Sequence, residues 1–347
     1  MEKLVIDKIN KCYSVNALTM GEESKLIFAG EGDGSLNIYS GEKYENKEVV
    51  WAESEKLGGT MTICGVEDME GCFFASTGFF TMIQSEASAI YLVRHLNGEY
   101  RREKVCDIPY LHRFDVLTVE GYRYLIACTL HSGKKDKDDW SAPGKILVAE
   151  LPFDLSGKVS VKPVVLKDGL FQNHGFNRAY EVGKAFVLVA AKEGVFQVMP
   201  PQKDKKEWSV EQIFDFPASD VCALDLDGDG KLEYGIISPF HGEHFSVYKR
   251  NGKTAVKIYE HEKKLDFYHA IYADYFCGEP SFVIGARKED MDLYRVFYNR
   301  EKGSIETEVI EEGAGSSNAR IVHTKAGDII MSANRQKDEA AIFFRKG

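Results

Sequence analysis

The sequence lacks the features that mark membrane-spanning or exported proteins. No stretch of its 347 residues is long and apolar enough to cross a bilayer, and residues 1–10 carry scattered charges where a signal peptide has an apolar core. The seven cysteines form no C-x-x-C pair, and Cys64, Cys128 and Cys222 lie in strand-like runs, as reduced core residues do. We therefore expect a cytoplasmic protein.

Positive charge is also scarce. The formal net charge is −10, and the chain has no stripe rich in Lys and Arg. This balance argues against nucleic acid and against anionic membranes as partners. No linker or low-complexity run divides the chain, so we expect one domain over residues 1–347, with the oligomeric state left open.

A complete structural unit is present between Ser219 and Tyr248. An alternating apolar run leads into the acidic turn 225–230, and a second run followed by the turn 239–242 leads into a third. Short apolar runs separated by turns rich in Gly, Pro and Asp predict an antiparallel meander.

Seven such units recur along the chain. Each opens with a polar residue before an alternating strand, and the openings are 43 to 62 residues apart. Four-stranded units at this period predict an all-β fold, a seven-bladed β-propeller. The seven opening residues are Asn16, Thr62, Asp115, Asn177, Asp220, His269 and Asn318.

The two ends of the sequence predict how the ring closes. Six units finish with a charged outer strand, whereas the seventh stops after the run 341–345 without one. The run from Leu4 to Ile9 is expected to supply that missing strand from the other end of the chain. Such closure leaves no long unpaired sheet edge.

Loop lengths indicate which face of the ring carries a site. In such meanders one face, here called the upper face, holds the starts of the innermost strands and the loops between second and third strands. Two of these upper loops are long, at 78–87 and 131–144. Long insertions on one face of a repeat fold typically border its binding site.

The acidic turn on the opposite, lower face has the pattern of a cation site. Oxygen ligands alternate along it, which favours a hard cation, and calcium is the expected ion. The alternative is a turn rich in Asp and Gly without an ion. The expected ligands are Asp225, Asp227, Asp229, the Lys231 carbonyl and Glu233.

Histidines gather at the upper ends of the predicted inner strands. His112 and His174 each stand three residues before the opening residue of their unit, in the contexts His-Arg-Phe-Asp and His-Gly-Phe-Asn. Grouped imidazoles suit Zn²⁺ or Mn²⁺, or acid/base work near neutral pH, although any single one is more often a hydrogen-bonded polar residue. The candidate metal ligands are His112, His131, His174 and His269, with His241 and His244 as weaker candidates.

Other polar and aromatic residues at the predicted channel are candidates for substrate binding. Asp115, Asn177, Asp220 and Asn318 offer hydrogen-bonding groups, although strand starts beside a wet channel are commonly polar. An arginine there suits a carboxylate, and a structural ion pair is the alternative. The arginine candidates are Arg287, Arg320 and Arg335. The aromatic ones are Tyr180, Trp140, Phe79 and Phe80, for which core packing is the alternative.

Two resemblances accompany these patterns. The run from Asp225 to Glu233 matches the D-x-D-x-D-G-x-x-[DE] loop of FG-GAP and VCBS propeller repeats, which implies a structural metal. The ring with histidines at its mouth resembles the propeller domain of aldos-2-ulose dehydratases. It is more distantly similar to seven-bladed ulvan lyases, whose pair of histidines has the spacing of His112 and His131. Both likenesses imply removal of a proton beside a carbonyl or carboxylate, with loss of a β-oxygen.

The resulting hypothesis is a lyase or dehydratase that acts on a small keto-sugar or sugar-acid derivative without an organic cofactor. A metal on the histidines would stabilise the enolate. The expected catalytic residues are His112, His174, Tyr180 and Arg320. The alternatives are a non-catalytic propeller that binds a ligand or a protein and, third, a hydrolase that uses Asp115 and Asp220.

Overall fold

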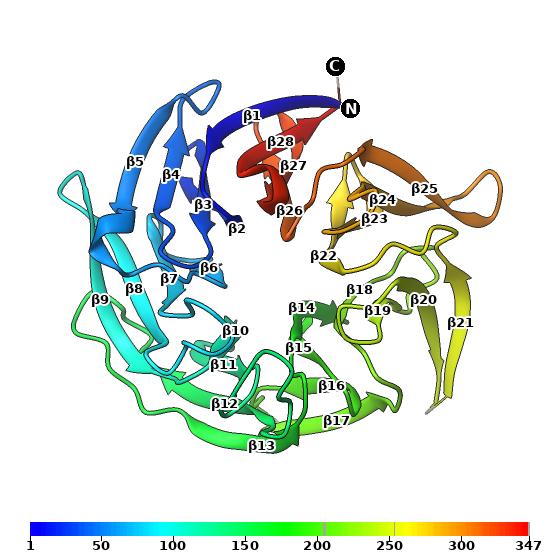
Figure 1. The fold of residues 1–347 in the computed structure, drawn as a ribbon, viewed down its shortest axis with the longest axis horizontal. Helices are drawn as coiled ribbons and strands as arrows, with labels where there is room; N and C mark the ends of the chain where they lie inside the picture. The colour runs from blue at the N-terminus through cyan, green and yellow to red at the C-terminus, as the bar shows by residue number, and fades with distance from the viewer. Residues whose placement is uncertain (204–205, 253, 346–347) are drawn as a thin grey trace.

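The computed structural model describes residues 1–203, 206–252 and 254–345, and these form a ring of β-sheets. Seven antiparallel four-stranded sheets surround a central channel, each with its first strand innermost (Figure 1). This arrangement is a seven-bladed β-propeller, which confirms the predicted fold class.

The inner strands line the channel and carry most of the residues discussed below. They begin at the upper face and run toward the lower one. They are β2 (Cys12–Met20), β6 (Ile63–Gly65), β10 (Leu111–Val119), β14 (Gly175–Glu181), β18 (Asp220–Leu224), β22 (Tyr268–Phe276) and β26 (Asn318–Thr324).

The remaining strands complete the blades outward from the channel. The second strands are β3 (Glu23–Gly30), β7 (Cys72–Thr77), β11 (Tyr122–Thr129), β15 (Lys184–Ala191), β19 (Glu233–Ser238), β23 (Glu279–Ala286) and β27 (Gly327–Asn334). The third are β4 (Leu36–Ser40), β8 (Ala89–Leu96), β12 (Gly144–Leu151), β16 (Gly194–Met199), β20 (His244–Asn251), β24 (Leu293–Asn299) and β28 (Glu339–Phe344). The outer ones are β5 (Asn46–Trp51), β9 (Glu99–Asp107), β13 (Val164–Leu170), β17 (Ser209–Phe214), β21 (Thr254–Glu260), β25 (Ser304–Glu311) and β1 (Glu2–Lys8).

The strand β1 closes the ring, as the sequence predicts. It pairs antiparallel with β28, with Leu4 opposite Ile342, and the last sheet has the order β1-β28-β27-β26. Asp7 then links this blade to the first one, because its Oδ2 accepts hydrogen bonds from the Tyr39 hydroxyl at 2.7 Å and the Lys47 ammonium at 2.6 Å.

The core lies between neighbouring sheets. The second strands are buried almost throughout, and all six residues of β7 are buried. Side chains of adjacent blades share one cluster, as Phe74 and Ile90 of the second blade do with Phe114 and Leu125 of the third. Burial of this apolar area, at about 25 cal/mol per Å², is the main stabilising term of such a fold.

A glycine sets the close approach of two inner strands beside the histidines described below. A Cβ atom on Gly175 of β14 would lie 2.6 Å from the Cα of Asp220 on β18. Because real Cβ atoms never approach so closely, only glycine allows β14 and β18 to converge at this height.

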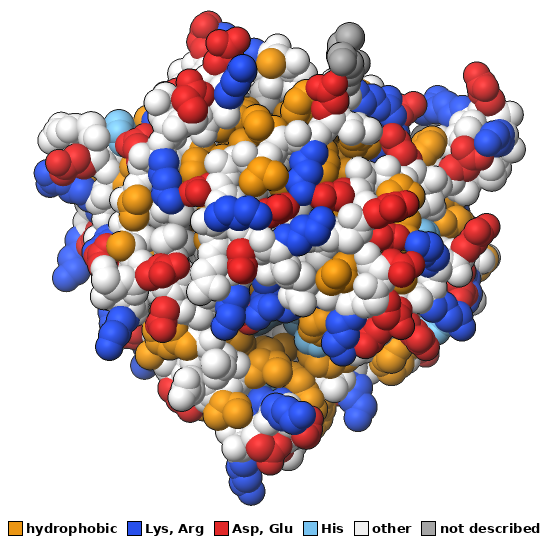
Figure 2. Space-filling view, turned by 45° about the horizontal axis from the view of Figure 1, so that its top comes forward, with side chains coloured by type: hydrophobic (Ala, Val, Ile, Leu, Met, Phe, Trp, Pro, Cys, Tyr) orange, Lys and Arg blue, Asp and Glu red, His pale blue; other side chains and the backbone are white. Residues whose placement is uncertain are grey.

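The surface mixes charges of both signs. Figure 2 shows Lys and Arg side chains interspersed with Asp and Glu over the face in view. Within the part of the chain that the structure describes, no helix is long and apolar enough to cross a membrane.

Removal of the Asp7 carboxylate tests the ring closure. Asp7→Ala leaves the hydroxyl of Tyr39, a residue only 2% exposed, without its acceptor, so we expect the free energy of unfolding to fall by about 1–3 kcal/mol. The control is Asp107→Ala, which removes an exposed ion pair with Lys104 and should change it by less than about 0.5 kcal/mol. Equal effects in denaturant unfolding would contradict a role for Asp7 in closure.

Candidate functional site

Four aromatic or imidazole side chains occupy the same place at the upper ends of four inner strands. Tyr13, His112, His174 and His269 each stand three residues before a residue that lines the channel: Asn16, Asp115, Asn177 and Tyr272. The structure therefore places Tyr272, and not His269, at the height of Asn16 and Asp115. This corrects the predicted register of the sixth blade by three residues.

The histidines meet above the channel. The ring centroid of His174 lies 4.6 Å from that of His112, 4.8 Å from that of His241 and 5.0 Å from that of His269. His241 comes from the loop after β19, where its φ of 47° lies in the left-handed region. Ligand nitrogens of His174, His241 and His269 lie within 4.8 Å of one another, so these three side chains could hold a metal ion.

Backbone carbonyls fix the orientation of two of these rings. Nδ1 of His174 donates to the Ser219 carbonyl at 3.2 Å, and Nδ1 of His269 donates to the Ser317 carbonyl at 2.6 Å. In a neutral imidazole, Nε2 then carries the lone pair. Metal-binding histidines are commonly held by a hydrogen bond of this kind.

Three imidazole nitrogens of this group have no hydrogen-bond partner. They are Nδ1 of His112, Nε2 of His174 and Nε2 of His241, and all are buried atoms. Buried polar atoms are nearly always paired, and an exception points to an unseen ion, water or ligand. In contrast, Nε2 of His269 accepts a hydrogen bond from the Tyr13 hydroxyl at 3.2 Å.

The environment of the cluster keeps its imidazoles neutral. Burial lowers the pKa of His174 to about 3, and the nearby Arg113 adds to this effect. Burial likewise holds the pKa values of His112, His241 and His269 well below their ordinary value. Their lone pairs are therefore available near neutral pH.

The charged groups beside the cluster are mainly cations. Arg113 donates to the Met61 carbonyl at 2.8 Å and lies over the ring of Tyr13. Arg287 lies over the ring of Phe267, which contacts His241 and His269, and its buried Nε has no partner. Burial and the charge of Arg335 lower the pKa of Arg287 to about 10, so it stays charged at neutral pH.

One carboxyl group lies next to the cluster. Oδ2 of Asp220 is 3.7 Å from Nδ1 of His174, and its Oδ1 accepts from the backbone N–H groups of Phe176 and Val221. Burial raises the pKa of Asp220 to about 7, although Arg113 opposes the shift.

Aromatic side chains cover the cluster. Phe240 stacks on His241 with ring centroids 4.0 Å apart, and Trp140, from the long upper loop, packs on Phe240 at 4.9 Å. The Lys134 ammonium lies 3.3 Å from the centre of the Trp140 ring and has no hydrogen-bond partner. The loop 131–144 thus borders the histidines, as its length led us to expect.

His131 stands apart from the other predicted ligands. Its Nε2 donates to the Met82 carbonyl at 2.8 Å, and its Nδ1 accepts from the Gly133 N–H at 3.1 Å. Both ring nitrogens are therefore engaged with backbone. Burial lowers its pKa to about 4. His244, which with His241 was a weaker candidate ligand, pairs with Glu260 at 3.2 Å.

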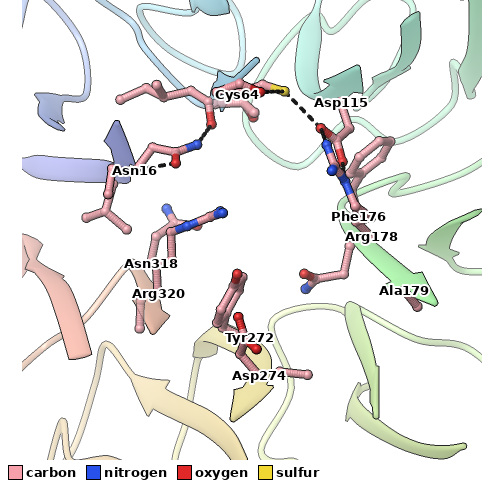
Figure 3. Close-up of a pocket in the computed structure, with 18 of the residues that line it drawn as sticks. Asn16, Cys64, Asp115, Phe176, Arg178, Ala179, Tyr272, Asp274, Asn318 and Arg320 are labelled. Carbon is pink, nitrogen blue, oxygen red and sulfur yellow. Dashed lines mark hydrogen bonds and ion pairs between the residues drawn. The ribbon is translucent and has the colours of Figure 1, made fainter. Parts of the chain in front are cut away.

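The structure separates Tyr180 and Arg320 from the histidines. Both line a cavity of about 830 Å³ that fills the channel below the cluster (Figure 3). Tyr180 lies six residues after His174 on β14, which is roughly 20 Å along an extended strand, and it is 53% exposed. A ligand held by His174 is therefore out of reach of the Tyr180 hydroxyl.

Asp115 and the asparagines line the same cavity, but their side chains are largely committed to the protein. Asp115 accepts two hydrogen bonds of 2.7 Å from Arg178, which outweigh burial and hold its pKa below the ordinary value. Asn318 donates to the Tyr13 carbonyl at 2.7 Å, and Asn177 to the Ile271 carbonyl at 3.4 Å. On the upper face, Arg335 forms an ion pair with Glu31.

The acidic turn contains a cation supplied by the chain itself. The Lys249 ammonium lies 2.7 Å from Asp227 Oδ2, 2.7 Å from Asp229 Oδ2 and 3.0 Å from Glu233 Oε1. Lys249 reaches them because it is the cross-strand partner of Glu233. The carboxylates of Asp225, Asp227 and Asp229 could hold a metal ion, which would have to displace this ammonium.

Sequence reasoning missed several residues of the upper site. The sequence does not single out Tyr13, Arg113 or Phe240, and it places His241 among the weaker candidates. The repeated spacing of three residues between Tyr13 and Asn16, as between His112 and Asp115, was a signal that could have found Tyr13. No local signal indicates that Arg113 approaches the rings.

The fold places the chain in the class of seven-bladed β-propellers, and the solved structures that it resembles support the same class. No protein-family model matches the chain, and no curated protein matches it in sequence.

Solved structures with a similar fold include two proteins described as lactonases. A candidate 6-phosphogluconolactonase from Bacteroides uniformis has a TM-score of 0.55 and 11% identity, over 90% of this chain and 89% of its own. The periplasmic gluconolactonase of Pseudomonas aeruginosa has a TM-score of 0.58 and 14% identity, over 96% of this chain and 92% of its own. At such identities the likeness establishes the fold alone.

The buried imidazoles predict sensitivity to acid. Their pKa values are lower in the folded than in the unfolded chain, so unfolding takes up protons below about pH 6.5. The free energy of unfolding of chelator-treated protein should therefore fall as the pH drops from about 6.5 to 4. Asp220, with its raised pKa, opposes this trend but is a single group.

Denaturant unfolding across this pH range measures the effect. His131→Gln removes one of these groups without touching the rings around His174, and it should give a shallower pH dependence than wild type. A stability that is flat or rises toward pH 4 would contradict neutral, buried histidines.

The internal ammonium predicts how the acidic turn responds to calcium. Lys249→Met leaves four carboxylates facing one another, of which only that of Glu233 is fully buried, so we expect a loss of about 1–3 kcal/mol in chelator and recovery with added calcium. Wild type should gain little from calcium in thermal unfolding. Lys257→Met, which removes an exposed ion pair with Glu260, is the control. Equal stabilisation of wild type and Lys249→Met by calcium would show that the ammonium does not occupy the turn.

Proposed function

We propose that this protein is an enzyme that acts on a small anionic sugar derivative at the upper end of the channel. The observation that carries the proposal is the convergence of three unpartnered imidazole nitrogens, from His112, His174 and His241, in a buried site. Buried groups kept neutral by their surroundings are typical of sites that bind a metal or move protons.

The residues of the site fit a borderline divalent metal such as Zn²⁺ or Mn²⁺. His174, His241 and His269 would hold it, since their rings are neutral and two of them are oriented by carbonyls. A bound metal would polarise a substrate carbonyl or carboxylate and stabilise negative charge on it.

The charges around the cluster favour an anionic substrate. Arg113 and Arg287 both face the histidines, and Arg287 has no ion pair with any described residue. Asp220 is the one carboxyl group in direct contact with a ring of the cluster, and its raised pKa limits its negative charge at pH 7. A carboxylate or enolate on the substrate would complete this charge balance.

The chain offers both a base and an acid for proton transfer. Nδ1 of His112, which lies outside the group that would hold the metal, is free to accept a proton from the carbon beside a carbonyl or carboxylate. The Tyr13 phenol, which burial keeps protonated by raising its pKa, would be released from Nε2 of His269 when that nitrogen holds a metal, and it could then donate to a leaving oxygen. The distant Tyr180, expected among the catalytic residues, has no part in this proposal.

The reaction that we propose is a β-elimination. A C–H bond beside the carbonyl breaks, its electron pair forms a carbon–carbon double bond, and the C–O bond at the β position breaks as the leaving oxygen takes up a proton. This assignment keeps the chemistry of the dehydratases that the sequence resembles. The protein is proposed to act in the cytoplasm, with no nucleic acid or membrane partner.

Lactone hydrolysis is a second candidate, because the two structural neighbours are described as lactonases. In that reaction water attacks the ring carbonyl and the same base would take a proton from the water. The ring C–O bond breaks, and the released oxygen takes up a proton from the Tyr13 phenol. Product analysis distinguishes the two, since elimination gives an unsaturated product and hydrolysis gives a saturated acid.

The experiment combines metal analysis with a substrate screen. Wild type purified without chelator is expected to contain a stoichiometric transition metal and to convert a keto-sugar or a uronate, followed by product absorbance and NMR. His174→Gln should lose the metal and lower the rate by about 10²–10⁴-fold.

The matched control is His323→Gln, which removes a histidine that is 54% exposed and distant from the cluster. It should retain both metal and activity. If elemental analysis of wild type finds calcium but no transition metal, the metal-assisted part of the proposal is wrong. Absence of turnover on keto-sugars, uronates and lactones would support the non-catalytic alternative.

A further inference from the structure

The guanidinium of Arg320 is a charge without a partner inside the protein. It lies over the ring of Tyr272 with its central carbon 5.2 Å from the ring centre. No residue that the structure describes forms an ion pair or hydrogen bond with it. Figure 3 shows the side chain pointing into the channel, across from Asp115 and Arg178.

The other arginines of the cavity have hydrogen-bond partners within the protein. Arg178 holds Asp115 through two hydrogen bonds of 2.7 Å and also pairs with Glu67. Arg113 donates to the Met61 carbonyl at 2.8 Å. The carboxylate of Asp274 on β22 pairs with His323 at 3.6 Å and accepts a hydrogen bond from the Tyr275 N–H at 2.8 Å. Arg320 is thus the one arginine of this cavity with neither an ion pair nor a hydrogen bond to a described residue.

The cavity has the size and access that a small ligand needs. It encloses about 830 Å³, within the range of ligand sites. Its exposed lining residues, among them Glu67, Tyr180 and Tyr275, lie at the lower ends of the inner strands. Entry is therefore from the lower face, opposite the aromatic cover of the histidines.

Hydrogen-bonding groups surround the free charge. The amides of Asn16, Asn177 and Asn318 each donate to a backbone carbonyl, which orients their oxygens, and those of Asn177 and Asn318 accept no hydrogen bond from a described residue. The Tyr272 hydroxyl forms none either. Oriented acceptors around one cation suit a ligand with several hydroxyl groups and one acid group.

This cavity is separate from the histidine site. Arg320 lies three residues below Ser317, whose carbonyl holds His269, so roughly 10 Å of strand separates the two levels. Arg113 and Asp220 lie between them, since both line the cavity and both adjoin the histidines. A monosaccharide bound to Arg320 would leave the upper site free.

We infer that the lower channel is a second binding site, for a small polyhydroxylated anion whose acid group pairs with Arg320 and whose hydroxyl groups meet the asparagine amides. The acid group is a carboxylate, as in a sugar acid, or a phosphate, as in a sugar phosphate. The planar guanidinium of Arg320 can donate two parallel hydrogen bonds to either group.

Calorimetric titration of the full chain tests this site. The probes are gluconate, glucose 6-phosphate and neutral glucose, and the background is His174→Gln/Arg287→Gln, which impairs the upper site. One of the two anions should bind at least about tenfold more tightly than glucose. Arg320→Gln in this background should weaken that anion about tenfold or more, while Arg101→Gln, an exposed arginine on β9, should change nothing.

Arg320→Lys guards against a folding defect in the Gln variant. Lysine keeps the charge but not the fork, so it should bind more weakly than arginine. Equal affinity of the Arg and Lys forms, equal affinity of the Arg and Gln forms, or no binding of either anion would each overturn the inference. If wild type binds an anion and the background variant with Arg320 intact binds none, the anion belongs to the upper site. That result would also overturn the inference.

Discussion

The backbone pairing of β1 with β28 is the contact on which the rest of this structure depends. Each sheet is only four strands wide and buries its faces against its two neighbours. The inner strands therefore stay at the same distance from the channel axis only if the ring is closed. The first strand of the chain closes it. The Asp7 bridge to Tyr39 and Lys47 carries that closure across to the first blade.

Closure turns distant positions of the sequence into neighbours at two levels of one channel. Tyr13 and His269 are 256 residues apart and share a hydrogen bond at the upper level, where imidazoles are neutral and the surrounding charges are cationic. At the lower level the chain keeps one unpaired guanidinium among amides. The protein thus presents a covered, buried site and an open one on a common axis.

The periodic features of the sequence predicted the fold and its closure, whereas the site was predicted only in part. Turn residues and alternation act locally, so the blade count and the role of β1 were accessible. His174 and His269 meet in the structure, although His269 stands three residues from its predicted register and His131 stands apart. His241 depends on a loop conformation, and Lys249 enters the acidic turn only through its register with Glu233. The sequence predicts where Arg320 and Tyr180 stand along their strands. It does not predict which end of the channel is covered, because that depends on how Trp140 and Phe240 pack.

The pairing of β1 with β28 also has a topological consequence. Glu2 lies opposite Phe344, so the two ends of the chain run along adjacent strands of a single blade (Figure 1). A short peptide joining them would make the backbone circular, and the chain could then be reopened in any of the links between blades with every strand pair intact. Circular permutants would therefore move the break away from the last blade while leaving both levels of the channel assembled.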